Sequence, residues 1–210
     1  ACERSYARPR FIHVSSLAAA GPASEGAPVK ESDKPQPVSE YGRSKLEAEK
    51  TVLASAMAAR ATIVRPPVVY GPRDTDVFQM FKSVSRGLMF RIGKGESYFS
   101  YIHVWDLVDG LLHVARRSGA GGKVYNLANR APLSWGEFAD VSARAMMRGV
   151  KLVNIPYKLA LAAGKCADLA SRISGRPNIF SAEKVREAAY RYWTCDTAAA
   201  ETELEYTPEL

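Results

Sequence analysis

Two short apolar segments with a helical stretch between them constrain the fold of this chain more than any other feature. Residues 10–16 form the first segment, which ends in two serines, and residues 61–65 form the second, which runs into Pro66. Short apolar strands separated by a helix are typical of a parallel sheet, because parallel strands are joined by crossover helices. Ligands of such sheets bind beyond the carboxyl ends of the strands, so we expect a site near Ser16 and Pro66.

The stretch between the strands holds a tyrosine and a lysine four positions apart, in Tyr41-Gly42-Arg43-Ser44-Lys45. If this stretch is helical, the two residues share a face and the Lys45 ammonium lies beside the Tyr41 hydroxyl. A neighbouring cation favours the phenolate form of a tyrosine. The pair is therefore suited to passing a proton to or from a substrate oxygen near neutral pH.

The helix that carries this pair is expected to begin at Ser39, whose side chain suits a helix cap. The helical period predicts a buried stripe on it. The members of that stripe are Tyr41, Lys45, Ala48, Val52 and Ala56. Elsewhere, His13 and His103 lie inside apolar strands and are expected to be hydrogen-bonded core histidines. Asp106 is expected to cap the helix that follows the second of them.

The order of motifs along the chain adds a family resemblance. A strand ending in serine precedes the Tyr-x-x-x-Lys stretch, and Arg65-Pro66-Pro67-Val68-Val69-Tyr70-Gly71-Pro72 follows it. Two later matches are residues 99–106 and residues 123–128. Taken together, the chain resembles the extended short-chain dehydrogenase/reductase family, in its branch of NAD-dependent epimerases/dehydratases and 3β-hydroxysteroid-dehydrogenase-like enzymes. The resemblance covers most of residues 10–207. It implies an α/β fold, namely the C-terminal part of a Rossmann-type doubly wound parallel sheet plus a small α/β substrate-binding lobe.

The resemblance also implies a mechanism and a site. NAD or NADP would exchange a hydride with a substrate alcohol or ketone while Tyr41 moves the proton at oxygen, and no metal would be required. Lys45 would favour the Tyr41 phenolate and hold the cofactor ribose, and Ser16, preferred over Ser15, would orient the substrate oxygen. The backbone of four residues would face the nicotinamide: Pro66, Pro67, Val68 and Val69. Without that context, each of these residues has an ordinary structural role in packing, capping or solvation.

The predicted domain division follows from the same resemblance. Residues 1–72 are expected to be the remainder of the NAD(P)-binding domain and residues 73–210 mainly a substrate-binding lobe, with residues 106–128 returning to the Rossmann sheet. The family's Gly-x-x-Gly-x-x-Gly phosphate motif does not occur in the sequence. We therefore expect the C-terminal part of a longer enzyme, which alone is inactive, binds NAD(P) feebly or not at all, and associates through an exposed strand.

The charge and the cysteines of the chain limit the classes of partner and compartment that fit it. The 29 basic and 22 acidic residues give a net charge of +7, but the basic residues are scattered, which argues against nucleic-acid binding. The three cysteines, Cys2, Cys166 and Cys195, are widely spaced, which suits a reducing cytoplasm rather than a disulfide framework. Residues 155–173 come nearest to a membrane span, but charged residues interrupt them. Those residues are Lys158, Lys165, Asp168 and Arg172.

Several alternatives stay open at this point. The apolar residues 77–90 favour a hydrophobic alcohol or ketone over a nucleotide sugar, although a packed core explains the same residues. Epimerase or reductase, NAD or NADP, and monomer or homodimer are not distinguished. A degenerate, non-catalytic family member that acts as a binding module is the main alternative to an enzyme. A basic nucleic-acid-binding module would need a clustered positive face.

Overall fold

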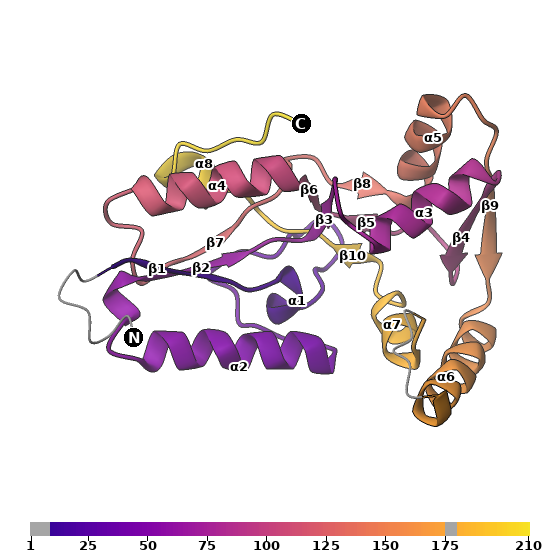
Figure 1. The fold of residues 1–210 in the computed structure, drawn as a ribbon, viewed down its shortest axis with the longest axis horizontal. Helices are drawn as coiled ribbons and strands as arrows, with labels where there is room; N and C mark the ends of the chain where they lie inside the picture. Colours follow the sequence, from indigo (N-terminus) through magenta and orange to yellow (C-terminus); the bar gives the residue numbers. More distant parts are fainter. Residues whose placement is uncertain (1–8, 175–179) are drawn as a thin grey trace. The chain divides into compact units, whose positions relative to one another are not determined.

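The computed structural model describes residues 9–174 and 180–210, and the chain forms two compact units (Figure 1). The first unit contains residues 9–72, Phe99–Pro132 and Tyr192–Leu210, and the second contains Arg73–Tyr98 and the described part of Leu133–Arg191. Cys2 lies outside the described residues. Short strands β5 (Tyr98–Phe99), β8 (Leu133–Ser134) and β10 (Tyr192–Trp193) fall where the chain passes from one unit to the other.

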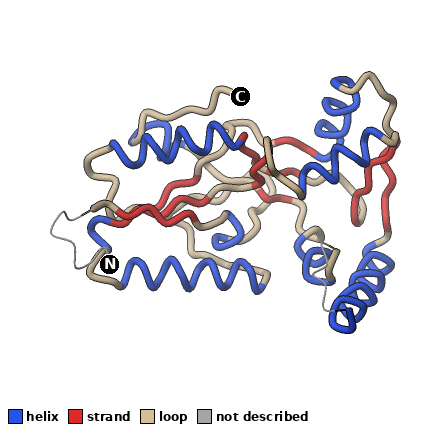
Figure 2. The backbone as a smooth tube through the Cα atoms, in the orientation of Figure 1, coloured by secondary structure: helices blue, strands red, loops and turns tan. Residues whose placement is uncertain are grey.

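The first unit is built on a parallel sheet of three strands in the order β1-β2-β7 (Figure 2). These strands are β1 (Phe11–Val14), β2 (Ala61–Arg65) and β7 (Val124–Asn126). The central strand β2 is buried along its whole length, as an apolar strand covered on both faces should be. The parallel α/β arrangement predicted from the sequence is therefore confirmed.

Helices cover both faces of this sheet (Figure 1). On one face lie α1 (Leu17–Ala20) and α2 (Glu40–Ala54), and on the other lie α4 (Val104–Arg116) and α8 (Ala198–Glu203). A short 3₁₀ helix (Ala58–Arg60) precedes β2, and a parallel pair, β3 (Val68–Tyr70) with β6 (Tyr101–His103), follows it. The main core includes Val64, Ile102, Leu107, Val114, Tyr125, Leu127, Leu204 and Tyr206.

The buried face of α2 differs from the predicted stripe. Ser39 caps the helix as expected, with its hydroxyl accepting from Gly42 N at 3.1 Å. The buried positions are Gly42 and Glu49, however, whereas Tyr41 is 48% exposed. The helix is rotated because Gly42 packs against α1: a Cβ atom on this glycine would lie 2.3 Å from the Ala18 carbonyl oxygen.

The expectation that Asp106 caps α4 is wrong. His103, not Asp106, is the residue that caps α4, and its side chain accepts from Trp105 N at 3.4 Å. Asp106 lies inside the first turn, where its buried carboxylate accepts from Glu209 N at 3.2 Å and Leu210 N at 3.1 Å. The capping position must precede the first helical residue, and α4 begins at Val104, three residues before the start that an Asp106 cap would give.

The second unit contains a parallel strand pair and two pairs of helices. Strand β4 (Leu88–Ile92) pairs with β9 (Lys151–Ile155), and the core beside them joins Val84 and Met89 to Ala139 and Ala143. The helices are α3 (Asp76–Ser85), α5 (Trp135–Ala145), α6 (Tyr157–Ser174) and α7 (Ala182–Glu187). Within residues 9–174 and 180–210, no helix is both long and apolar enough to cross a bilayer.

Candidate active site

The turns that follow β1 and β2 are joined by backbone hydrogen bonds. Ser15 N donates to Val64 O at 2.7 Å, and Leu17 N donates to Pro66 O at 2.9 Å. The two strands are parallel neighbours, so their carboxyl ends lie together at one edge of the sheet. Ser16 and Pro66 are thus placed at the edge where the sequence predicts a site.

Ser16 is the residue that begins helix α1. Its backbone is extended, with φ −159° and ψ 152°, and its hydroxyl oxygen accepts from Ala18 N at 3.2 Å. This is the capping role that an isolated serine at a strand end commonly takes. A hydroxyl that accepts one hydrogen bond still has its own proton to donate. The cap therefore leaves Ser16 able to act as a donor to a substrate oxygen.

Tyr41 and Lys45 lie in the first two turns of α2, beside the end of β1. The Lys45 ammonium lies 5.7 Å from the centroid of the Tyr41 ring, within the range of a cation–π contact. The same Nζ atom donates to Val14 O at 3.4 Å. The structure thus brings the lysine, the tyrosine ring and the carboxyl end of β1 together.

A buried ion pair fastens this helix to the sheet. The guanidinium of Arg65 binds the carboxylate of Glu49 at both oxygens, with Nε–Oε1 at 2.9 Å and Nη2–Oε2 at 2.6 Å. The Ser15 hydroxyl donates to Glu49 Oε1 at 2.5 Å. Both charged side chains are at most 4% exposed. Glu49 lies one helical turn beyond Lys45, so the pair ties the face that carries Lys45 to the ends of β1 and β2.

The sequence analysis missed this ion pair although a signal was present. Arg65 ends a strand that is otherwise apolar, and a buried arginine requires a carboxylate partner. Glu49 is the acidic residue four positions after Lys45 on the neighbouring helix. Those two facts together would have pointed to the pair.

His13 lies on β1 close to the same charges. Its Nε2 atom is buried and has no hydrogen-bond partner among the described residues, so the expectation of a fully hydrogen-bonded histidine is wrong at this atom. Burial lowers the pKa of His13, and the neighbouring Lys45 lowers it further. Both effects favour the neutral imidazole.

The segment 66–69 passes from β2 into β3. Pro66 is buried, and its carbonyl is already occupied by Leu17 N, whereas Val68 and Val69 are half-buried and pair with β6. Gly71 follows with φ 132°. A Cβ atom there would lie 2.8 Å from Val104 Cγ1, so this turn requires glycine for both conformation and space.

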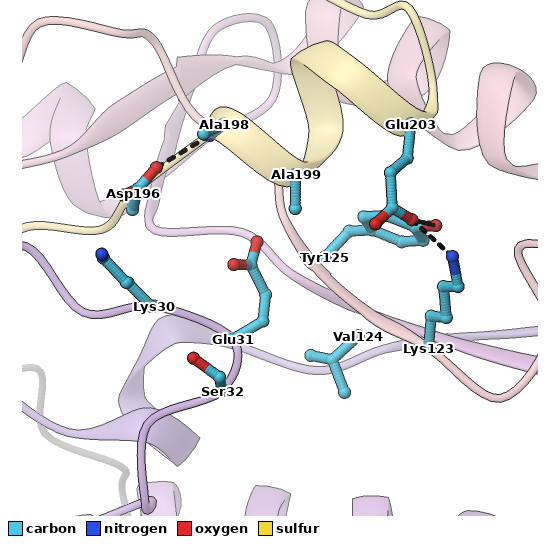
Figure 3. Close-up of a pocket in the computed structure, with 10 residues that line it drawn as sticks. All are labelled: Lys30, Glu31, Ser32, Lys123, Val124, Tyr125, Asp196, Ala198, Ala199 and Glu203. Carbon is cyan, nitrogen blue, oxygen red and sulfur yellow. Dashed lines mark hydrogen bonds and ion pairs between the residues drawn. The ribbon is translucent and has the colours of Figure 1, made fainter.

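A separate cavity of about 490 Å³ lies along β7, which is the edge strand of the sheet opposite β1 (Figure 3). The Glu31 carboxylate accepts from Asn126 N at 2.9 Å, and burial raises its pKa. Glu203 accepts from Lys123 at 2.6 Å and from the Tyr125 hydroxyl at 2.8 Å. None of the residues predicted for the site lines this cavity, although Lys123, Val124 and Tyr125 belong to the family match at residues 123–128.

Comparison with known proteins gives a family match and consistent relatives. The model of the NAD dependent epimerase/dehydratase family matches residues 1–128. A ceramide reductase of Caulobacter vibrioides is 31% identical over 189 residues, which is 90% of this chain and 55% of that protein. The N-acetyl-alpha-D-glucosaminyl-diphospho-ditrans,octacis-undecaprenol 4-epimerase of Escherichia coli O157:H7 is 27% identical over 156 residues, 72% of this chain and 47% of that protein.

Solved structures show the same fold. A UDP-glucuronic acid 4-epimerase from Bacillus cereus, in complex with UDP-glucuronic acid and NAD, aligns over 100% of this chain and 59% of its own. The TM-score is 0.75 and the sequence identity is 19%. The chain spans about half the length of the curated relatives named above.

Proposed function

The chain belongs to the NAD-dependent epimerase/dehydratase family, and we propose that it carries the acid–base site of an NAD(P)-dependent oxidoreductase or epimerase. The observation that carries this proposal is the position of Lys45, whose ammonium lies between the Tyr41 ring and the Val14 carbonyl at the carboxyl end of β1. That edge of a parallel sheet is where nucleotide cofactors and their substrates bind.

The residues at this edge fit one end of the cofactor. The contact from Lys45 to Val14 O is long, at 3.4 Å, which leaves the ammonium able to donate to ribose hydroxyls. We assign the ribose and nicotinamide end to Tyr41, Lys45 and the backbone of Pro66–Val69. When bound, NAD(P) supplies or accepts a hydride at the substrate carbon. The Gly-x-x-Gly-x-x-Gly motif for the phosphates does not occur in this sequence.

The proton chemistry is assigned to three side chains. Tyr41 transfers a proton to or from the substrate oxygen, and its 48% exposure leaves the ring accessible to a ligand. Lys45 stabilises the phenolate form electrostatically. The Ser16 hydroxyl donates a hydrogen bond to the same substrate oxygen and stabilises the charge that develops there.

Glu49 and Arg65 are assigned a positioning role. Helix α2 carries both Tyr41 and Lys45, and the buried ion pair sets the rotation of that helix against β1 and β2. A small misplacement of reacting groups lowers turnover strongly. The pair therefore supports catalysis without touching the substrate.

We place the substrate among hydrophobic alcohols and ketones. Phe78 on α3 and Phe90 on β4 are exposed, whereas Val84 and Met89 of the same stretch are packed in the core. A core role thus explains only part of this apolar segment. The relative named as a ceramide reductase supports the same substrate class, and the relative named as an undecaprenol-linked sugar epimerase supports a lipid-linked sugar as the second candidate.

Replacement of Tyr41 by phenylalanine tests the proposal. In the enzyme that contains this chain, Tyr41→Phe should lower turnover about 100-fold or more while NADH and NADPH binding is retained. Tyr157→Phe, on α6, is the matched control and should leave turnover unchanged. Turnover is followed by the absorbance of the reduced cofactor, and cofactor binding by calorimetry. Wild-type turnover in Tyr41→Phe would rule out the acid–base role of Tyr41. Absence of turnover in the wild-type enzyme would instead favour a non-catalytic binding module.

A further inference from the structure

Helix α6 presents an exposed apolar stripe that the proposed function does not use. Leu159, Leu169 and Ile173 are 63%, 60% and 80% exposed. The smaller exposed members of the stripe are Ala162, Ala163, Cys166 and Ala170. At 3.6 residues per turn these positions fall within one arc of the helix surface and extend over most of its length. Contiguous apolar surface of this kind marks an interaction site.

The opposite face of α6 packs against α7, and the two helices lie side by side in Figure 1. Ala160 and Gly164 are buried, and a Cβ atom on Gly164 would lie 2.9 Å from Ala182 Cα. Asp168 accepts from Ala182 N at 3.1 Å. This packing holds the helix in one rotation, so the stripe cannot turn inward within the second unit.

A row of basic residues runs beside the stripe. Lys158, Lys165 and Arg172 recur every seven residues and are exposed. Residues seven apart lie almost above one another on a helix, so the three charges follow a single edge of the apolar arc. The only acidic residue of α6 is Asp168, and it is engaged with α7. The exposed face of α6 is therefore apolar in its middle, positive along one edge and free of negative charge.

We propose that α6 docks on the surface of an anionic lipid bilayer and lies in the plane of the interface. Apolar side chains on one face with lysine or arginine beside them are the features of interfacial helices. Each basic residue near an anionic leaflet adds attraction. Helix α6 does not combine the length and the apolar character needed to cross the bilayer, and the net charge of +7 adds to the same attraction.

Charge complementarity favours lipid over a second copy of the chain. The face that a second α6 would present carries the same three basic residues and no acidic residue to pair with them. Lipid phosphates provide the negative charge that the basic row requires, and acyl chains accept the apolar side chains.

Binding to vesicles tests the electrostatic half of the proposal. The protein should sediment with vesicles that mix phosphatidylglycerol with phosphatidylcholine, more weakly as salt is added, and should not bind phosphatidylcholine alone. The triple variant Lys158→Gln, Lys165→Gln, Arg172→Gln should lose about tenfold or more in affinity. The matched control replaces three exposed basic residues of the same unit, Lys82→Gln, Arg86→Gln and Lys151→Gln, and should lose much less.

A fluorescent label on Cys166 tests the apolar half. Cys166 is exposed, whereas burial raises the pKa of the Cys195 thiol to about 12, so a Cys2→Ser protein is labelled mainly at Cys166. An environment-sensitive dye there should shift to shorter wavelength with the anionic vesicles. Leu169→Gln with Ile173→Gln should abolish the shift, whereas Val108→Gln with Leu112→Gln on α4 should preserve it.

Three results would overturn the proposal. The first is the lack of binding to anionic vesicles by the folded protein. The second is binding that survives both sets of α6 substitutions. The third is concentration-dependent self-association that needs Leu169 and Ile173 in the absence of lipid, which would assign the stripe to a second copy. Because these assays do not involve Tyr41 or turnover, their failure leaves the proposed function standing.

Discussion

The ion pair at the end of β2 and the ion pair at the edge of β7 use the same chemistry in opposite surroundings. In each, a carboxylate binds a cation and a hydroxyl: Glu49 binds Arg65 and Ser15, and Glu203 binds Lys123 and Tyr125. The first pair is at most 4% exposed, whereas the Lys123 and Glu203 side chains are 48% and 44% exposed. Because the partners are of the same kind, a comparison of the two pairs shows how burial alone changes their contribution to stability.

The largest difference should appear when one cation is removed. Arg65→Met leaves the Glu49 carboxylate buried without its charge partner and should lower the free energy of unfolding by about 3–5 kcal/mol. Urea titration at neutral pH measures this. A loss below about 1 kcal/mol would mean that water or another group reaches Glu49, and the comparison with β7 would fail.

Removal of both charges should restore much of that stability. Arg65→Met combined with Glu49→Leu replaces a buried ion pair by apolar side chains and should unfold at higher urea than Arg65→Met alone. Turnover of the parent enzyme should stay low in the double variant, because the rotation of α2 is no longer set by the pair. Stability that recovers together with full turnover would refute the positioning role.

The exposed pair should respond weakly to the same treatment. Lys123→Met should change the free energy of unfolding by about 1 kcal/mol or less, because water replaces the lost partner of Glu203. Hydrogen bonds from Lys123 and then Tyr125 lower the pKa of Glu203. A carboxyl group whose pKa is lowered by folding stabilises the protein above its unfolded pKa, and this stabilisation is lost as pH falls through its folded pKa. Wild type and variant should therefore converge on acidification, and urea titrations at several pH values follow this.

The smallest effect should come from Glu31, in the cavity along β7. Burial raises the pKa of Glu31. The contribution of Glu31 to stability is therefore fully present below its unfolded pKa and is lost as pH rises through its folded pKa. Glu31→Gln keeps an acceptor for Asn126 N but carries no charge. The variant should gain in melting temperature relative to wild type as pH rises through the acid range. A gain that instead grows on acidification would contradict the assignment.

Local signals predicted the elements well because they need no distant partner. Ser39 caps α2 through an oxygen three residues away from its donor, and the apolar strands β1 and β2 are read from their own side chains. The parallel order of these strands followed from the helix between them. The catalytic roles of Ser16, Tyr41 and Lys45 stay predictions until turnover is measured.

The errors lie where a residue far along the chain decides the outcome. The rotation of α2 depends on the fit of Gly42 against Ala18 and on Arg65, which is 16 positions from Glu49. Asp106 binds the backbone of Glu209 and Leu210, more than a hundred residues away, and no cap pattern anticipates that contact. Periodicity places a side chain on a face, but it does not say which face the rest of the chain selects.

The contact between Gly42 and the Ala18 carbonyl has a consequence for how freely this region can vary by mutation. Any other residue at position 42 places a Cβ atom where the backbone of α1 already lies. Any substitution of Gly42 should therefore displace α1, the helix that Ser16 caps. Arg43 and Ser44, the next two residues, are exposed and face no such limit. Substitutions at positions 42, 43 and 44 should therefore show one intolerant position, Gly42, followed by two tolerant ones.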